Sequence, residues 1–280
     1  MMTNNHCLIN IRGKLVSLYH PLVMGILNVT PDSFYAGSRK QTDNEIARRT
    51  NEIIEQGGSI IDVGAFSTRP GAPEVTQEEE MARLRHGLTI VRQQQPDAIV
   101  SVDTYRPDVA RMAVEEYGAD IINDVSEGGI TGRANVPLEA HDGIPEMFAM
   151  MGKLQVPYIL MSVKPSICPM MKAFAQEVEM LHDLGVKDII LDPGFGFGKT
   201  LDDNYLLLKD MDKLQEMRLP VLVGVSRKSM IFKLFGYTPN ESLNGTTIIN
   251  TIALQKGAAI LRVHDVKEAV ECITIFEKTR

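Results

Sequence analysis

The chain repeats one pattern of apolar and polar positions: a glycine, then a short aliphatic run that ends in a polar residue. The pattern occurs as GGSIID (57–62), GADIIN (118–123), GVKDIILD (185–192) and GAAILR (257–262). Glycine often ends a helix because it accepts a positive φ. An Ile/Val/Leu run without polar alternation is typical of a strand buried on both faces. Each unit therefore predicts a helix end, a turn and a parallel strand.

The same reading, applied to the whole chain, predicts eight strands with helices between them. We expect strands at about 23–29, 59–63, 98–103, 121–125, 157–162, 188–192, 220–225 and 258–263. We expect helices at about 42–58, 76–91, 106–117, 170–184, 202–218, 240–256 and 266–279. Two of these helices start with capping-box spacing, Thr42 with Glu45 and Thr76 with Glu79. The Gly/Pro-rich segment 127–145 predicts a long loop before a short helix.

Strict alternation of buried strands with helices predicts an α/β protein with a parallel sheet. Eight units in 280 residues favour a single closed (β/α)8 TIM barrel spanning residues 1–280. An open, doubly wound sheet is the alternative. No change in composition suggests a linker or a second domain.

Composition narrows the class of protein further. The chain has 36 acidic and 29 basic residues, a net charge of −7, which argues against general attraction to nucleic acid or anionic membranes. Three widely separated cysteines (Cys7, Cys168 and Cys272) indicate a reduced cytoplasm rather than a disulfide scaffold. No apolar stretch approaches bilayer length, and the first residues contain no secretory h-region. We expect a soluble cytoplasmic protein.

Polar residues stand at the carboxyl ends of seven of the eight predicted strands. They are Asn28, Asp62, Ser101–Thr104, Asn123–Asp124, Asp192, Ser226–Lys228 and Arg262–His264. Ligands of parallel α/β proteins bind at this end of the sheet. Asp62 and Asp124 have the alternative role of capping the following helix. Together with Arg69, the set suits a ligand with a hydrogen-bonding heterocycle at one end and an anion at the other.

Common local motifs do not account for these residues. PGFGFGKT (193–200) lacks the first glycine of a P-loop, since Pro193 stands there, and Lys199 replaces the last glycine of a dinucleotide fingerprint. GVSRK lacks the final glycine of a nucleophile elbow. The sequence contains no HExxH motif and no clustered Cys/His residues, so it does not favour a zinc site.

Seven longer segments, taken together and in order, resemble the dihydropteroate synthase family. They are MGILNVTPDSF (24–34), STRPGA (67–72), SVDT (101–104), NDVS (123–126), LDPGFGFGK (191–199), VGVSRKSM (223–230) and RVHDV (262–266). The resemblance implies a (β/α)8 barrel that joins (7,8-dihydropterin-6-yl)methyl diphosphate to 4-aminobenzoate, giving 7,8-dihydropteroate and diphosphate in folate biosynthesis. It also implies Mg²⁺, an SN1-like path, a homodimer and a sulfonamide target.

The resemblance also assigns roles to individual residues. It implies that the pterin contacts are Asp103, Asn123, Asp192 and Lys228, and that the diphosphate contacts are Thr68, Arg262 and His264. Asn28 matches the Mg²⁺ ligand. We expect the loops at 28–37 and 67–72 to close over the diphosphate and to help form the aminobenzoate slot through Asp32, Phe34, Arg69 and Pro70. Phe197 and Ser229 are expected walls of that slot. The expected catalytic residues are Asn28, Asp32, Arg69, Lys228 and Arg262.

Three segments depart from the family pattern. MSVKPS (161–166) lacks the histidine of the usual Met-His-Met-like run, the loop Glu127–Pro145 is longer than usual, and Phe66 replaces a common acidic residue. Two other functions stay open: a pterin-binding methyltransferase of the same barrel group, which uses methyltetrahydrofolate and a corrinoid partner, and a pterin-binding paralogue without catalysis.

Overall fold

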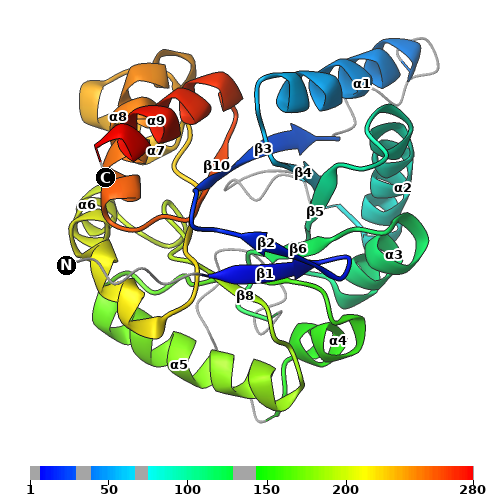
Figure 1. Cartoon of the computed structure of the whole chain (residues 1–280), viewed down its shortest axis with the longest axis horizontal. Helices are drawn as coiled ribbons and strands as arrows, with labels where there is room; N and C mark the ends of the chain where they lie inside the picture. Colours follow the sequence, from blue (N-terminus) through cyan, green and yellow to red (C-terminus); the bar gives the residue numbers. More distant parts are fainter. Residues whose placement is uncertain (1–6, 30–38, 67–74, 129–142, 280) are drawn as a thin grey trace.

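Eight parallel strands form the centre of the molecule in the computed structural model, which describes residues 7–29, 39–66, 75–128 and 143–279 (Figure 1). The strands are β3 (Leu22–Asn28), β4 (Ile60–Gly64), β5 (Ile99–Asp103), β6 (Ile121–Asp124), β7 (Tyr158–Met161), β8 (Ile189–Asp192), β9 (Leu222–Val223) and β10 (Ile260–Val263). Their order is β8-β7-β6-β5-β4-β3-β10-β9, and a parallel bridge between Leu191 and Val221 joins the two ends. The predicted barrel is confirmed, and the open-sheet alternative is wrong.

Helices surround the ring of strands (Figure 1). They are α1 (Arg39–Glu55), α2 (Gln77–Gln94), α3 (Pro107–Tyr117), α4 (Glu146–Leu154), α5 (Ile167–Asp183), α6 (Leu201–Asp210), α7 (Ser229–Phe235), α8 (Leu243–Gln255) and α9 (Val266–Lys278), with 3₁₀ turns η1 (Met211–Met217) and η2 (Pro239–Glu241). The predicted helix 202–218 is therefore α6 followed by η1. The short helix expected after the long loop is α4, whereas α7 was not predicted.

The two predicted capping boxes differ in outcome. Thr76 is the N-cap of α2, and its side-chain oxygen accepts a hydrogen bond from the Glu79 amide at 3.2 Å. Helix α1 instead begins at Arg39, so that Thr42 lies inside the helix and the predicted cap at Thr42 is wrong. Upstream residues continue this helix, and a local spacing pattern does not exclude such an extension.

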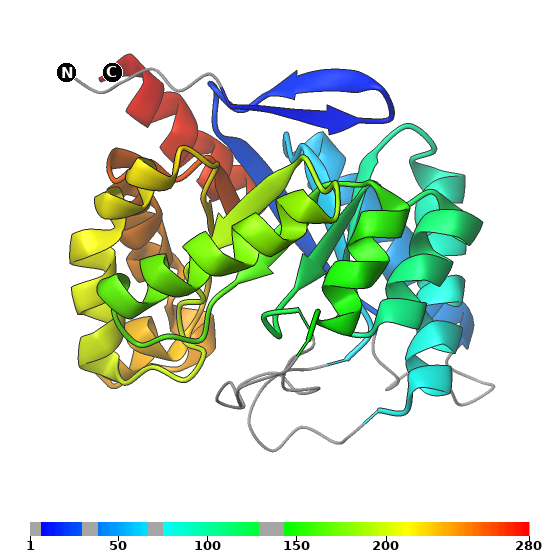
Figure 2. The same ribbon diagram turned by 90° about the horizontal axis from the view of Figure 1, so that it is seen from below.

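A hairpin of β1 (Leu8–Ile11) and β2 (Lys14–Ser17), which was not predicted, crosses the amino-terminal end of the barrel (Figure 2). Its buried residues Ile9 and Ile11 pack with the barrel-filling side chains Ile60 and Ile121. The Arg12 guanidinium bonds Asp120, with Nε 2.6 Å from Oδ1, and so ties the hairpin to the barrel. The hairpin covers one end, which leaves ligand access to the carboxyl ends of the strands.

Apolar side chains form two groups, one inside the barrel and a larger one between the strands and the helices. The cysteines are free thiols: Cys7 is half-buried, Cys168 exposed and Cys272 buried. Within the described segments, no helix has the length and apolar character needed to cross a membrane.

Candidate active site

Strand register brings the predicted polar residues to one rim of the barrel. Asn28 pairs with Gly64, Gly64 with Asp103, and Asp103 with Asn123, across four neighbouring parallel strands. A cavity of about 990 Å³ opens at this rim. Of the predicted site residues, it is lined by Asn28, Asp103, Phe197, Lys228, Ser229, Arg262 and His264. Asn123 and Asp192 are buried next to it.

The floor of the cavity is a network around Arg262. Its Nε lies 2.6 Å from Asp62 Oδ2, and its Nη2 lies 2.7 Å from Asp103 Oδ2. The Asn123 amide donates to the same Asp62 oxygen at 3.2 Å. Asp62 is a charged residue inside the apolar strand β4, and its side chain binds Arg262 of β10, so the capping role considered for it is wrong. Asp62 was among the polar residues predicted at the strand ends, and its charge within an apolar run was the signal.

Burial changes the ionisation of this network. Burial raises the pKa of Asp103 to about 7, against the opposing effect of Arg262 and with a further increase from Asp62. Burial lowers the pKa of Arg262, but the charges of Asp62 and Asp103 outweigh it and leave that pKa above its ordinary value. Asp62 Oδ1, Asp103 Oδ1 and Asn123 Oδ1 are buried acceptors without a hydrogen-bond partner among the described residues. Unsatisfied buried acceptors fit a ligand that supplies N–H donors.

Lys228 lies beside the acidic floor, at the start of α7. Its Nζ donates to the Phe195 carbonyl at 2.5 Å and lies 4.5 Å from the centre of the Phe197 ring. Burial lowers the pKa of Lys228 to about 8, although the charge of Asp192 opposes this change. Asp192 accepts a hydrogen bond from the Gly194 amide at 2.8 Å, and burial raises its pKa. Lys228 and Asp192 are therefore a buried cation and carboxylate at the same end of the barrel.

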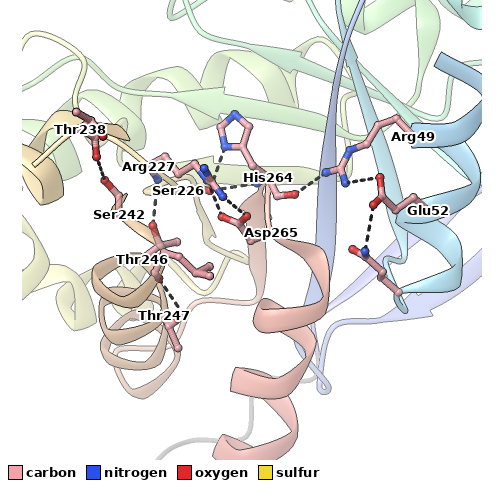
Figure 3. Close-up of polar contacts among 12 residues, drawn as sticks. Arg49, Glu52, Ser226, Arg227, Thr238, Ser242, Thr246, Thr247, His264 and Asp265 are labelled. Carbon is pink, nitrogen blue, oxygen red and sulfur yellow. Dashed lines mark hydrogen bonds and ion pairs between the residues drawn. The ribbon is translucent and has the colours of Figure 1, made fainter. Parts of the chain in front are cut away.

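His264 is fixed by contacts on both sides (Figure 3). Its Nδ1 lies 3.0 Å from Ser226 Oγ, which also accepts the His264 backbone N–H at 3.1 Å. Arg49 donates to the His264 carbonyl at 2.6 Å. Burial, with the charge of Arg262, lowers the pKa of His264 to about 4, so the imidazole is neutral at pH 7. Arg49 was not among the predicted site residues, because nothing local in α1 indicates a contact with the end of β10.

The segment between Ser226 and Lys228 is held by a second pair (Figure 3). Arg227 has a left-handed backbone, with φ of 55°. Its side chain makes two hydrogen bonds to Asp265, at 2.9 and 2.6 Å, and its backbone N–H donates to Thr246 Oγ1 at 3.1 Å. A left-handed conformation is unfavourable for a non-glycine residue, and these bonds stabilise it at Arg227. They therefore help to position the backbone of the adjacent Lys228.

Several predicted residues lie outside the described part of the chain, namely Asp32, Phe34, Thr68, Arg69 and Pro70. Of the long loop, Glu127, Gly128 and residues 143–145 are described. Glu127 is buried and accepts hydrogen bonds from Ser162 Oγ at 2.9 Å and Val163 N at 2.8 Å. The atypical segment after β7 is thus anchored to the first residue of the loop. Asp124 accepts from the Ser126 and Gly128 amides, at 2.8 and 2.9 Å, and orders the turn between them.

The donor set at the rim suits a metal ion held mostly by other ligands. The described residues contain no group of three or more His, Cys, Asp or Glu able to hold a metal. Asn28 is exposed at the end of β3, and a Cβ added to Gly64 would lie 3.6 Å from Asn28 Oδ1 and 3.8 Å from Asp103 Oδ2. One amide oxygen fits Mg²⁺, which keeps several waters and is often bound through substrate phosphates.

Fold and site together define a class: a barrel enzyme with buried acceptors for a nitrogen heterocycle next to cations for an anion. The chain belongs to the pterin-binding enzyme family, which it matches over residues 24–264. It is 39% identical to dihydropteroate synthase of Escherichia coli K12 over 271 residues, 96% of this chain and 95% of the relative.

Solved structures give the same result. The chain is similar to Xanthomonas albilineans dihydropteroate synthase with 4-aminobenzoic acid, with a TM-score of 0.84, 33% identity and 97% of each chain covered. It is also similar to the Coxiella burnetii enzyme in complex with pteroic acid, with a TM-score of 0.80, 31% identity, and 97% of this chain and 98% of that chain covered. The activity is thus that of a dihydropteroate synthase, a transferase of folate biosynthesis.

Proposed function

We propose that the chain joins (7,8-dihydropterin-6-yl)methyl diphosphate to 4-aminobenzoate by an SN1-like path, with Mg²⁺. The observation that carries this proposal is the group of unpartnered buried acceptors on Asp62, Asp103 and Asn123, beside Arg262 and Lys228. A pterin has an edge of N–H donors and, next to it, a carbonyl oxygen and ring nitrogens that accept. Asp192 and the cavity floor offer acceptors for the N–H groups, and Lys228 offers a cation for the carbonyl oxygen and ring nitrogens.

The pterin is bound by groups that are each already oriented. Asp192 accepts the amidine-like edge, and Asp103 and Asn123 bind neighbouring ring atoms. Lys228 donates to the ring carbonyl and a ring nitrogen. Its position over Phe197 and its bond to the Phe195 carbonyl support this orientation, because they hold the ammonium at the cavity wall.

The other end of the substrate is the diphosphate. Arg262 and the neutral His264 supply donors for it, with Thr68 from the second loop. Asn28 would hold Mg²⁺, which when bound would offset part of the diphosphate's negative charge. The bond from the methylene carbon to the diphosphate oxygen breaks with its electron pair on the oxygen. Electron release from the dihydropterin ring stabilises the resulting cation, and buried carboxylates below add a favourable field.

The amine of 4-aminobenzoate then forms the new carbon–nitrogen bond and loses a proton. Phe197 packs on its ring, and the Ser229 hydroxyl faces its carboxylate; both residues line the cavity, which supports this assignment. Asp32, Phe34, Arg69 and Pro70 complete the slot from the two loops. A sulfonamide has a similar ring and amine, so we expect it to compete with 4-aminobenzoate here.

We also propose a cytoplasmic homodimer. Free thiols at Cys7, Cys168 and Cys272 support a reducing compartment. Large apolar side chains are exposed at the end of α7 (Leu234 and Phe235), just after it (Tyr237) and on α8 (Ile248), each at least half exposed. The Phe235 and Tyr237 rings stack at 5.4 Å. A group of exposed large apolar side chains of this kind is typical of a subunit interface.

Diphosphate release from the pterin diphosphate tests the reaction. We expect release that requires both 4-aminobenzoate and Mg²⁺, with dihydropteroate as the second product. Pterin binding without turnover would instead support the non-catalytic paralogue. Methyl transfer from methyltetrahydrofolate to a corrinoid partner would support the methyltransferase.

A further inference from the structure

Lys199, the lysine of the segment PGFGFGKT, has a role that its resemblance to a phosphate loop does not explain. Its Nζ donates to three main-chain carbonyls: Ser162 at 3.0 Å, Gly194 at 2.9 Å and Phe197 at 3.1 Å. An ammonium group has three N–H donors, so all of them are used within the protein. The charge of Lys199 therefore acts on the backbone of this loop.

These bonds connect two loops at the rim of the barrel. Gly194 and Phe197 belong to the loop between β8 and α6, and Ser162 directly follows β7. The two loops are in direct contact, because a Cβ added to Gly194 would lie 2.2 Å from the Ser162 carbonyl oxygen. Gly194 has a φ of +64°, a left-handed conformation that leaves its carbonyl available to the ammonium.

The bonds of Lys199 also support the backbone of Phe197. Within the described residues, the Phe197 N–H donates to the Gly194 carbonyl at 3.1 Å, which is itself bound by Lys199. On its other side, the loop is held by Asn204, whose Oδ1 accepts the Gly196 N–H at 2.7 Å. The Phe197 ring faces the cavity next to Lys228 Nζ. The position of the ring thus depends on bonds that converge on Lys199.

We propose that Lys199 is a positioning residue that holds the Phe197 ring in the wall of the 4-aminobenzoate slot by linking the β8–α6 loop to the end of β7. This inference rests on the proposed function. Lys199 acts on Phe197, a wall of the 4-aminobenzoate slot, and reaches the pterin site only through the contact of Phe197 with Lys228. Its loss therefore affects the KM for 4-aminobenzoate more than the KM for the pterin diphosphate. Burial lowers the pKa of Lys199 to about 8, and the charge of Asp192 opposes this change only in part.

Steady-state kinetics of Lys199→Met with both substrates tests the proposal. We expect the KM for 4-aminobenzoate to rise about tenfold, which corresponds to about 1.4 kcal/mol, while the KM for the pterin diphosphate stays within about twofold. Lys213→Met is the matched control, because Lys213 is exposed and forms its ion pair with Asp210, at 3.0 Å, away from the cavity. An unchanged KM for the amine, or an equal rise in both values, would overturn the proposal.

A double-mutant cycle with Phe197→Leu shows whether the two residues act together. If Lys199 works through Phe197, Lys199→Met has little further effect on the amine KM in the Phe197→Leu background. Additive effects contradict the proposal. Lys199→Arg keeps the positive charge and repeats the comparison in case the Met variant does not fold. Its planar guanidinium cannot reach three carbonyls as an ammonium does. We therefore expect a KM for 4-aminobenzoate between those of the wild type and Lys199→Met. A wild-type enzyme without turnover would refute the proposed function instead.

Discussion

Asp62 and Arg262 are 200 positions apart in the chain and form an ion pair between β4 and β10, the two neighbours of β3, with 2.6 Å between Oδ2 and Nε. Asp62 is fully buried, and the Arg262 side chain is 18% exposed. The pair joins β4 to β10, and Arg262 extends it to Asp103 on β5. Arg262 therefore belongs both to the predicted diphosphate site and to the network that links β10 with β4 and β5.

Removing Asp62 leaves a buried cation without one of its two carboxylates. We expect Asp62→Ala to lower the free energy of unfolding by about 3 kcal/mol, measured by urea denaturation. Asp210→Ala is the control, because Asp210 forms an exposed pair with Lys213, and we expect a loss below about 1 kcal/mol. Equal losses in the two variants would mean that Arg262 does not need Asp62 in the folded protein.

The raised pKa of Glu177 on α5 predicts that the stability of the protein depends on pH. Burial, and then the charge of Glu127, raises its pKa from 4.5 to about 8. The folded protein therefore holds a proton that the unfolded chain releases near pH 4.5, so stability falls as pH rises from about 4.5 to about 8. We expect Glu177→Gln to raise the melting temperature at pH 8 and to change it little at pH 4.5.

Glu179→Gln is the matched control for this measurement, since Glu179 is an exposed residue of the same helix. Asp124, Glu127, Tyr158 and Lys164 also act on Glu177 or lie in its cluster, and they are unchanged in both variants. If the Glu177→Gln variant lost as much stability toward pH 8 as the wild type does, the effect would belong to another group.

The lowered pKa of Lys228 predicts that the activity depends on pH. Because its pKa is lowered to about 8, it becomes neutral as the pH rises through about 8 and stops offsetting the charge of Asp192. We expect kcat/KM for the pterin diphosphate to fall above about pH 8 at saturating 4-aminobenzoate. Lys228→Arg keeps its charge at this pH and should move the fall to higher pH, even if the maximal rate is lower. A profile that is flat to about pH 9.5 would exclude Lys228 as the titrating group.

The proposed role of Asn28 as a Mg²⁺ ligand predicts that its substitution changes the Mg²⁺ requirement of the enzyme. We expect Asn28→Ala to raise the Mg²⁺ concentration for half-maximal diphosphate release about tenfold, a loss of about 1.4 kcal/mol of binding. Asn44→Ala, an exposed asparagine on α1, is the control. A Mg²⁺ requirement that is the same in all three proteins would show that Asn28 is not a ligand.

The proposed place of Phe235 in the dimer interface predicts that its substitution by a charged residue changes the oligomeric state. It is 54% exposed at the end of α7, within the apolar surface assigned to the dimer. We expect light scattering to give twice the chain mass of 31.1 kDa for the wild type and a single chain mass for Phe235→Asp. Leu15→Asp changes an apolar residue that is 70% exposed on the hairpin, at the other end of the barrel, and should leave the dimer intact. A wild-type monomer would refute the dimer directly.

Local patterns in the sequence predicted most of the barrel. The strand expected at 98–103 is Ile99–Asp103, and the strand expected at 188–192 is Ile189–Asp192. These segments are strongly apolar and follow glycine stops or turns, so tertiary contacts do not change their assignment. The prediction was poorer where pairing is limited, as in the segment 220–225, of which only Leu222–Val223 is a strand. The hairpin Leu8–Ser17 was missed because its short strands gain most of their burial from contact with the barrel.

The sequence by itself determined that polar residues such as Asn28, Asp103 and Asp192 meet at one rim, because the carboxyl ends of parallel strands lie at the same end of a barrel. Only the tertiary structure decided which of them bind one another. The pairing of Asp62 with Arg262, the contact of Ser226 with His264, and the three carbonyls around Lys199 all join distant segments. Such contacts form only when the strands and their loops are packed side by side, and burial then changes the charges of the residues involved. No spacing along the chain encodes those distances.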